Sequence, residues 1–338
     1  MRVLIIGGTN FIGPPLVLHL VSLGHEVTVF HRGRTHADLP TGVGEIHGDR
    51  HALHDHAARF RRIGPEVVVD MIAFTEADAL GVVGMFRGLA RRTVVISSAD
   101  VYRAYGRFLG IEGGQDEATP LSEDAPLRSA LFPYRQQAQG PDDFRHDYDK
   151  IPVERSYLGD PQLPGTVLRL PMVHGPGDPY RRLSCYLKRM DDERPLIVLD
   201  HGMARWRCPR GFVQDVAAAI ARSVVDDRAT GRVYNVADPV AFTEAEWVAK
   251  IGEVVGWEGE VVSVPAGRIP LPYRCEQHLD TDPSRLGHEL GVIEWVDGIE
   301  ALGRTVAWER ANPPESIQGI GLLDYGAEDA LLAEMGLG

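Results

Sequence analysis

The sequence predicts an α/β protein in which a doubly wound parallel sheet is joined to a smaller C-terminal lobe. Through the first half of the chain, short apolar segments of strand length alternate with longer segments of helix length. A glycine-rich turn follows the first apolar segment directly. Strands that alternate with helices form parallel sheets covered on both faces, because every crossover helix returns the chain to the same edge.

The first half of the chain contains most of the expected sheet. We expect strands at 3–6, 27–30, 45–47, 66–70 and 93–97, with helices at 14–23, 52–63 and 76–90. Pro14 and Pro15 suit the first turn of the first helix, where a missing N–H is tolerated. Residues 103–146 are rich in glycine, proline and charge and are too long for a plain connection, so we expect an active-site flap or insert there.

The alternation resumes in the second half. We expect helices at 148–158, 212–225, 243–255 and 298–310, strands at 166–170 and 233–236, and a loop at 174–178. Thr243 and Glu246 have the spacing of a capping box. Residues 311–338 are expected to form an appended, marginally structured tail.

Charge and cysteine content exclude several classes of protein. The formal net charge of −13 disfavours long phosphate backbones and argues against a nucleic-acid partner. Three scattered cysteines fit neither a disulfide framework nor a zinc knuckle. No apolar run approaches membrane-spanning length and no signal peptide is evident, so we expect a cytoplasmic protein without a membrane partner.

Histidines crowd one part of the N-terminal half. His47 and His51 are four residues apart, but no carboxylate or thiol partner stands at ligand spacing, so no metal is expected. The cluster consists of His31, His36, His47, His51, His54 and His56.

The glycine-rich turn is the first candidate binding site. It lies between a strand and a helix, where glycines let the backbone approach a pyrophosphate and the helix N-terminus supplies N–H donors. This context predicts a Rossmann-like dinucleotide-binding domain at 1–170, to which 212–238 return. Residues 171–211 and 239–310 then form the substrate lobe. The expected cofactor contacts in the turn are Gly7, Thr9, Asn10, Phe11, Ile12 and Gly13.

The end of the second strand bears on the choice of cofactor. An NAD site usually has an acidic residue there for the ribose 2′-hydroxyl, whereas this chain has His31, Arg32 and Arg34. Guanidinium groups bind a 2′-phosphate well, so NADP(H) is favoured over NAD(H). Asp49 and Arg50 follow the third strand, where an adenine amino group would be bound.

Several motifs together resemble a known family. The turn Gly-Gly-Thr-x-Phe-Ile-Gly, with Asn10 in place of a middle glycine, and the strand end Ser97-Ser98-Ala-Asp-Val-Tyr102 resemble extended or atypical short-chain dehydrogenases/reductases of the NAD-dependent epimerase/dehydratase type. The variant turn is similar to that of chloroplast stem-loop-binding proteins. The resemblance covers residues 1–310 and implies that Ser98 hydrogen-bonds the reacting oxygen while Ser97 lies at the cofactor.

The resemblance extends to later segments. It implies that Pro171 and Val173 pass the nicotinamide and that Arg210 holds a substrate diphosphate, although the segment after Arg210 is shorter than in the family. Trp206 lies among arginines ahead of Arg210 and is a candidate for stacking on a base or sugar, with packing as the alternative.

One residue of the family pattern is missing. Lys150 matches the lysine of the Tyr-x-x-x-Lys pair, but the position four residues before it is His146. In a helix these two positions share a face. Three interpretations remain open: His146 acts as acid and base, Tyr148 or Tyr134 reaches the site through a distorted helix start, or oxidoreduction is lost.

The expected function follows from these sites. The leading hypothesis is an NADP(H)-binding oxidoreductase or epimerase-like enzyme that acts on a hydroxyl or carbonyl of a small molecule, with a nucleotide-linked sugar as one candidate. The alternative is a non-catalytic nucleotide-binding regulatory protein or an RNA-binding protein on the same scaffold, since a fold does not define a function. The resemblance also implies a homodimer.

Overall fold

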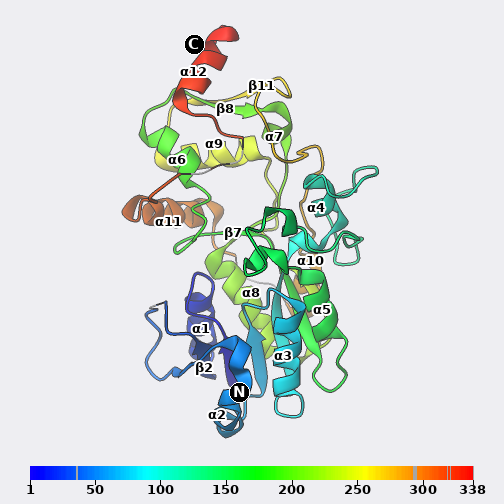
Figure 1. Ribbon diagram of the computed structural model, residues 1–338. Coiled ribbons are helices and arrows are strands. Elements are labelled where there is room, and N and C mark those ends of the chain that lie inside the picture. Colours follow the sequence, from blue (N-terminus) through cyan, green and yellow to red (C-terminus); the bar gives the residue numbers. More distant parts are fainter. Residues whose placement is uncertain (36, 292–294, 318, 320, 338) are drawn as a thin grey trace.

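A single seven-stranded sheet forms the lower lobe of the molecule (Figure 1). The computed structural model describes residues 1–338 except 36, 292–294, 318, 320 and 338. Every pairing in the sheet is parallel and the strand order is β10-β6-β5-β4-β1-β2-β3. The strands are β1 (Arg2–Ile6), β2 (Glu26–His31), β3 (Gly44–His47), β4 (Val67–Asp70), β5 (Arg92–Ser98), β6 (Gly165–Leu170) and β10 (Val233–Asn235).

Helices cover both faces of this sheet. Val3 and Ile5 of β1 pack against α1 and α8, whereas Leu4 and Ile6 pack on the other face with α3 and α5. This two-residue alternation is what a strand buried on both faces requires. The helices around the sheet are α1 (Gly13–Ser22), α2 (Ala57–Ile63), α3 (Glu76–Phe86), α5 (Lys150–Leu158), α8 (Val213–Val225) and α10 (Ser284–Leu290).

The upper lobe is smaller and has its own core. Two-stranded parallel pairs join β8 (Leu196–Asp200) to β11 (Glu260–Val264) and β7 (Met172–His174) to β9 (Arg210–Phe212). The core of this lobe lies between α6, α9, α11 and β8. Its helices are α6 (Ser184–Asp191), α7 (His201–Arg205), α9 (Glu244–Val255), α11 (Gly298–Ala311) and α12 (Tyr325–Glu334).

The expected doubly wound parallel sheet is confirmed, and most expected elements lie within a few residues of their predicted bounds. The capping box of Thr243 and Glu246 is present at the start of α9. The expected insert contains α4 (Arg103–Phe108) and little other regular structure. The short 3₁₀ turns are η1 (Arg50–His56), η2 (Ala99–Val101), η3 (Arg135–Gln137), η4 (Phe144–His146) and η5 (Asp227–Ala229).

The expectation of a marginally structured tail is wrong for 325–334. These residues form α12, which packs on β8 and β11 at the end of the molecule farthest from the sheet (Figure 1). Leu331 and Leu332 are buried there, and Glu328 forms a buried ion pair with Arg189. Burial of apolar and paired charged groups against the upper lobe stabilises a helix that would be too short to persist alone.

No described helix is both long enough and apolar enough to cross a membrane.

Candidate active site

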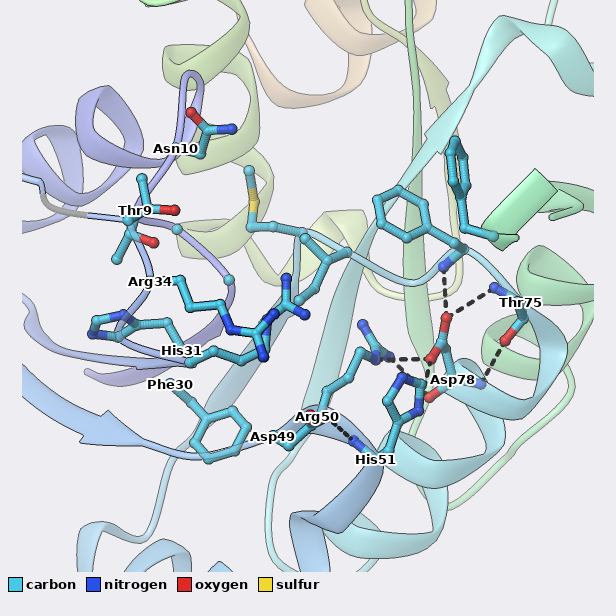
Figure 2. A pocket seen from close by; sticks show the side chains of 18 of the residues that line it. Thr9, Asn10, Phe30, His31, Arg34, Asp49, Arg50, His51, Thr75 and Asp78 are labelled. Carbon is cyan, nitrogen blue, oxygen red and sulfur yellow. Dashed lines mark hydrogen bonds and ion pairs between the residues drawn. The ribbon is translucent and has the colours of Figure 1, made fainter. Parts of the chain in front are cut away.

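A cleft of about 730 Å³ opens at the carboxyl ends of the strands. It lies where β1 has β2 on one side and β4 on the other, so that the chain order reverses there. Ligands of doubly wound sheets bind at such reversal points. Figure 2 shows Thr9, His31 and Arg34 on one side of this cleft and Arg50, Thr75 and Asp78 on the other.

The glycine turn forms one wall of the cleft. Gly7 and Gly8 both have φ of +91°, a conformation that side chains disfavour. A Cβ on Gly13 would lie 2.3 Å from a backbone carbon of Gly8, so only glycine allows this close approach. All six residues from Gly7 to Ile12 line the cleft, and Gly13 closes the turn by donating its N–H to the Asn10 carbonyl.

The start of α1 offers fewer donors than the sequence pattern implied. The N–H of Gly13 is engaged within the turn, and Pro14 and Pro15 have none. The Ile12 side chain makes no cap hydrogen bond. A pyrophosphate in this cleft would therefore depend on N–H groups of the turn itself and on the Thr9 and Asn10 side chains.

Two arginines follow β2 at the far end of the cleft. Arg32 and Arg34 line the cleft, and both are exposed. Neither forms an ion pair with a carboxylate among the residues that the structure describes. Their guanidinium groups are available for an anionic ligand.

His31 also lines this end and is part of a histidine–carboxylate cluster. The ligand atoms of His31, Glu45 and His47 all lie within 4.8 Å of one another. The His31 Nδ1 atom accepts the N–H of Gly33, so its Nε2–H donates to Glu45 at 2.8 Å. A metal on Nε2 would require the opposite tautomer, so this pair is better described as a hydrogen bond. His51 lies on η1 rather than beside His47 on one helix, and His36 lies outside the described residues.

Asp49 and Arg50 have different surroundings. Asp49 caps η1 by accepting the His51 N–H at 2.9 Å, and it lines the cleft. The Arg50 guanidinium is nearly buried, donates hydrogen bonds to both Asp70 oxygens at 3.0 Å and forms an ion pair with Asp78 at 2.9 Å. Asp70 and Asp78 already neutralise the charge of Arg50. Its guanidinium group is therefore engaged within the protein and is less available to a cofactor.

Lys150 begins α5 and is buried beneath the cleft. Its Nζ donates to the carbonyls of Ala73 at 2.6 Å and Ile96 at 3.0 Å. Phe74, which lines the cleft, has its ring centroid 5.0 Å from the same atom. Burial lowers the pKa of the Lys150 ammonium to about 8.

Tyr148 lies beside Lys150 and contacts a buried carboxyl group. Its hydroxyl donates to Asp100 Oδ2 at 2.8 Å, and its ring centroid is 5.8 Å from Lys150 Nζ. The Tyr134 hydroxyl lies 3.4 Å from the same Asp100 oxygen. Burial raises the pKa of Asp100 and of both tyrosines, and the Asp100 charge raises the tyrosine pKa values further.

The second carboxyl oxygen of Asp100 has no partner of its own in the part of the chain that the structure describes. Oδ1 is buried and has no hydrogen-bond partner among the described residues. Buried carboxyl oxygens are normally paired. Tyr148 and Tyr134 therefore both reach the Asp100 carboxyl, while Lys150 lies beside the Tyr148 ring and has its own backbone partners.

His146 is separated from this set. Helix α5 begins only at Lys150, because Asp149 has an extended backbone and caps the helix by accepting the Ile151 N–H. Asp149 is in turn held by the buried Arg128 guanidinium at 3.0 Å. His146 lies in η4, and its Nδ1 contacts the neighbouring Asp147 at 2.8 Å. The break at Asp149 removes the shared helix face on which the His146 hypothesis depended.

The serines of the strand-end motif have separate partners. Ser98 is partly exposed, and its Oγ accepts the Asp100 N–H at 3.2 Å. The Ser97 hydroxyl donates to buried Glu154 at 2.6 Å, which turns it away from the cleft. Pro171 is partly exposed, whereas the Val173 side chain belongs to the core.

The expected substrate residues are interior. Arg210 is buried, forms an ion pair with Glu244 and lies over the Trp247 ring. Trp206 is 2% exposed and stacks on Phe108 with ring centroids 4.9 Å apart. Of the two alternatives for Trp206, the structure shows packing, and neither side chain lines the described cleft.

Three contributors to the site were not expected from the sequence. Asp100 belongs to the strand-end motif that begins at Ser97, and Phe74 follows β4 at the carboxyl edge of the sheet, so both positions carried a detectable signal in the sequence. Phe144 comes from the insert and lies 6.2 Å from Phe74, ring centroid to ring centroid. Long-range packing of this kind leaves no local pattern in the sequence.

Comparison with known proteins supports the fold. No family model matches the chain. The 2′-dehydrokanamycin reductase of Streptomyces kanamyceticus is 27% identical over 273 residues, which cover 79% of this chain and 70% of that protein. The chloroplast stem-loop binding protein of 41 kDa b from Arabidopsis thaliana is 24% identical over 322 residues, or 89% of this chain and 77% of that protein.

Solved structures extend the comparison. The fold matches those of epimerases and dehydratases. The dTDP-glucose 4,6-dehydratase of Bacillus anthracis, solved in complex with NAD, superposes with a TM-score of 0.67 at 17% identity over 92% of this chain and 97% of that one. The chain therefore has the fold of the NAD-dependent epimerases and dehydratases that its motifs resemble.

Proposed function

We propose that this protein is an NADP(H)-dependent oxidoreductase that interconverts a carbonyl and a hydroxyl group on a small molecule. The observation that carries the proposal is the hydrogen-bonded pair of Tyr148 and Asp100 beside Lys150. Tyr148 and Lys150 both contact Phe74, which lines the cleft that holds the dinucleotide turn. Residues 1–170 with 212–238 would hold the cofactor, and 171–211 with 239–310 would hold the substrate.

The exposed arginines support NADP(H) over NAD(H). Arg32 and Arg34 line the end of the cleft beyond β2, and the structure describes no carboxylate paired with either. A 2′-phosphate there would receive charge-assisted hydrogen bonds, which are about twice as strong as neutral ones. A 2′-hydroxyl would leave both guanidinium groups without a ligand.

The protein supplies the proton chemistry. The bound cofactor would supply or accept the hydride. During reduction Tyr148 would donate its hydroxyl proton to the substrate oxygen, and the Asp100 carboxyl would return a proton to Tyr148. In the oxidative direction both transfers reverse, so that the proton ends on Asp100.

The electrostatics favour a relay over a stored phenolate. Burial and the neighbouring Asp100 raise the pKa of Tyr148 well above its usual value, so the phenol stays protonated. Burial also raises the pKa of Asp100, which favours the protonated form of its carboxyl group. In this proposal the Lys150 ammonium would orient the cofactor ribose, and Ser98 would hydrogen-bond the reacting oxygen.

The names of the compared proteins suggest the first substrates. One relative is named as a reductase of 2′-dehydrokanamycin, and one structural neighbour is named as a dTDP-glucose dehydratase. We therefore propose to test 2′-dehydrokanamycin and nucleotide-linked keto sugars first.

The test uses NADPH deuterated at the reactive carbon of its nicotinamide. The proposal predicts deuterium on the carbon of the product alcohol, detected by mass spectrometry, and loss of this transfer in Tyr148→Phe. Tight NADPH binding without transfer to any carbonyl substrate would contradict the enzymatic assignment.

One comparison favours the RNA-binding alternative. The relative from Arabidopsis thaliana is named for stem-loop binding. Binding to a stem-loop RNA in a gel-shift titration, with affinity that falls as salt rises, would support that function. Given the net charge of −13, we predict no specific RNA binding.

The assembly and location are also proposals. Leu80 on α3 is 55% exposed, Leu158 at the end of α5 is 40% exposed, and these two helices pack together on one face of the sheet. A homodimer through this face would cover both side chains and is tested by light scattering, with Leu80→Glu as the disrupting variant. The cytoplasmic location stays a prediction.

A further inference from the structure

A second cavity of about 320 Å³ lies between the two lobes and is separate from the cleft. It is bounded by the start of α8, residues 238–242, α9 and the first turn of α11. None of its lining residues lines the cleft. Four aromatic side chains contribute to its walls: Phe212, Phe242, Trp247 and Trp295.

Two carboxyl groups enter this cavity without a cationic partner. Asp215 accepts the Val296 N–H at 3.1 Å, and Asp238 accepts the Phe212 N–H. Within the described part of the chain, neither carboxyl forms an ion pair with lysine or arginine. Burial is the main cause that raises the pKa of Asp215 to about 6 and that of Asp238 to about 7, and the Asp215 charge raises the latter further.

The charged groups around this pair do not neutralise it. Arg210 approaches from β9 but is bound to Glu244, and Arg304 on α11 is bound to Glu300. Burial lowers the pKa of His174 to about 3, so its imidazole is neutral. Lys250 on α9 lies over the Phe242 ring, with Nζ 4.6 Å from the centroid, and is the cavity's own cation.

Exposed apolar side chains and a further carboxylate also line the cavity. Val240 is 60% exposed and Ile299 is 45% exposed, although both line the cavity. Asp297 at the start of α11 adds a third carboxylate. Three aspartates and one lysine therefore line this space together with aromatic and aliphatic groups.

We propose that this cavity binds a small organic cation, with its ammonium group between Asp215 and Asp238 and its apolar body against Phe242, Trp247 and Trp295. Aromatic faces attract cations, and an enclosed carboxylate pair without a counter-ion gains most from one. The volume suits a single small ligand. This site would be distinct from the proposed reaction and would persist if that proposal failed.

The test compares two probes that differ in charge and share one body. The probes are 2-phenylethylammonium and 2-phenylethanol, titrated into the full chain by calorimetry. We expect the ammonium to bind at least about tenfold more tightly than the alcohol. In Asp238→Asn this preference should shrink by about tenfold, while the amide oxygen can still accept the Phe212 N–H.

Proton linkage gives a second readout. Because a cation favours ionised carboxylates, its affinity should rise between about pH 5 and pH 8 as Asp215 and Asp238 ionise. Near pH 7 binding should release protons, which appears as a heat that depends on the buffer. Asp238→Asn should reduce this release.

A surface variant separates the site from the overall negative charge. Asp55→Asn removes one exposed carboxylate far along the chain from the cavity and should leave the affinity for the ammonium unchanged. Equal binding of both probes, or equal effects of Asp55→Asn and Asp238→Asn, would overturn the proposal. Preserved preference in a folded double variant Asp215→Asn/Asp238→Asn would do so as well.

Discussion

Replacement of Tyr148 by phenylalanine removes one hydroxyl from the proposed proton relay. The lost atom lies 2.8 Å from Asp100 Oδ2, and the ring itself keeps its contacts with Phe74 and Tyr134. General acid–base catalysis by a positioned side chain contributes about 10²–10⁴-fold to a rate. We therefore expect kcat to fall by about 10²–10⁴-fold, which corresponds to roughly 3–5 kcal/mol of barrier.

The effect on folding should be smaller and separable. A hydrogen bond of this kind contributes about 1–3 kcal/mol to stability, and the Tyr134 hydroxyl remains 3.4 Å from Asp100. The variant should stay folded and bind NADPH with an unchanged Kd in a calorimetric titration. The rate is followed by NADPH oxidation with the carbonyl substrate identified in the deuterium-transfer assay.

Two companion variants separate the role of Tyr148 from those of His146 and Tyr134. His146→Ala should change kcat by less than about twofold, because His146 lies in η4 and contacts Asp147. Tyr134→Phe should have a smaller effect than Tyr148→Phe, because its hydroxyl is farther from Asp100. If His146→Ala abolished turnover while Tyr148→Phe preserved it, the relay would be wrong.

Three further variants test the supporting structure. Gly13→Ala places a Cβ 2.3 Å from the backbone of Gly8, so it should lower the free energy of unfolding by about 1–3 kcal/mol in urea titrations and weaken NADPH binding in calorimetry. In the control variant Gly81→Ala the added Cβ meets open space, so neither quantity should change. Arg128→Met leaves the buried Asp149 carboxylate without its counter-ion, which should destabilise the protein by about 3–5 kcal/mol in urea titrations. A loss below about 1 kcal/mol would show that the ion pair does not hold the insert. Burial lowers the pKa of Lys150 from 10.5 to about 8. Between pH 8 and pH 10.5 the unfolded chain therefore binds a proton at this lysine that the folded chain does not bind. The free energy of unfolding consequently rises with pH across this window, by about 3 kcal/mol in all. The stability advantage of Lys150→Met over the native chain should therefore shrink across that window, and a constant difference would contradict the burial of a charged amine.

The sheet and the dinucleotide turn could be predicted because local patterns encode them. The alternation of Val3 to Ile6 buries a strand on both faces, and Gly13 is required wherever a helix start approaches the preceding turn this closely. Both features depend on residues near one another in the chain. The same holds for the exposed arginines after β2.

The proton-relay residues could be predicted only as alternatives. Whether His146 or Tyr148 faces Lys150 depends on the helix start, and Asp149 sets that start through a bond to Arg128 from a distant part of the insert. Spacing in the sequence cannot show such a contact. The ion pair of buried Arg210 with Glu244 and the packing of α12 on β8 and β11 also join segments that are far apart in the sequence. Sequence spacing could not show these contacts either.

The most direct test of the central claim is a parallel calorimetric titration of the protein with NADPH and NADH. We expect tighter binding of NADPH, and a loss of at least about tenfold in its affinity when Arg32 and Arg34 are both replaced by alanine, with little change for NADH. Equal affinity for the two cofactors, or a preference that survives the double replacement, would contradict the assignment of these arginines and of the cofactor.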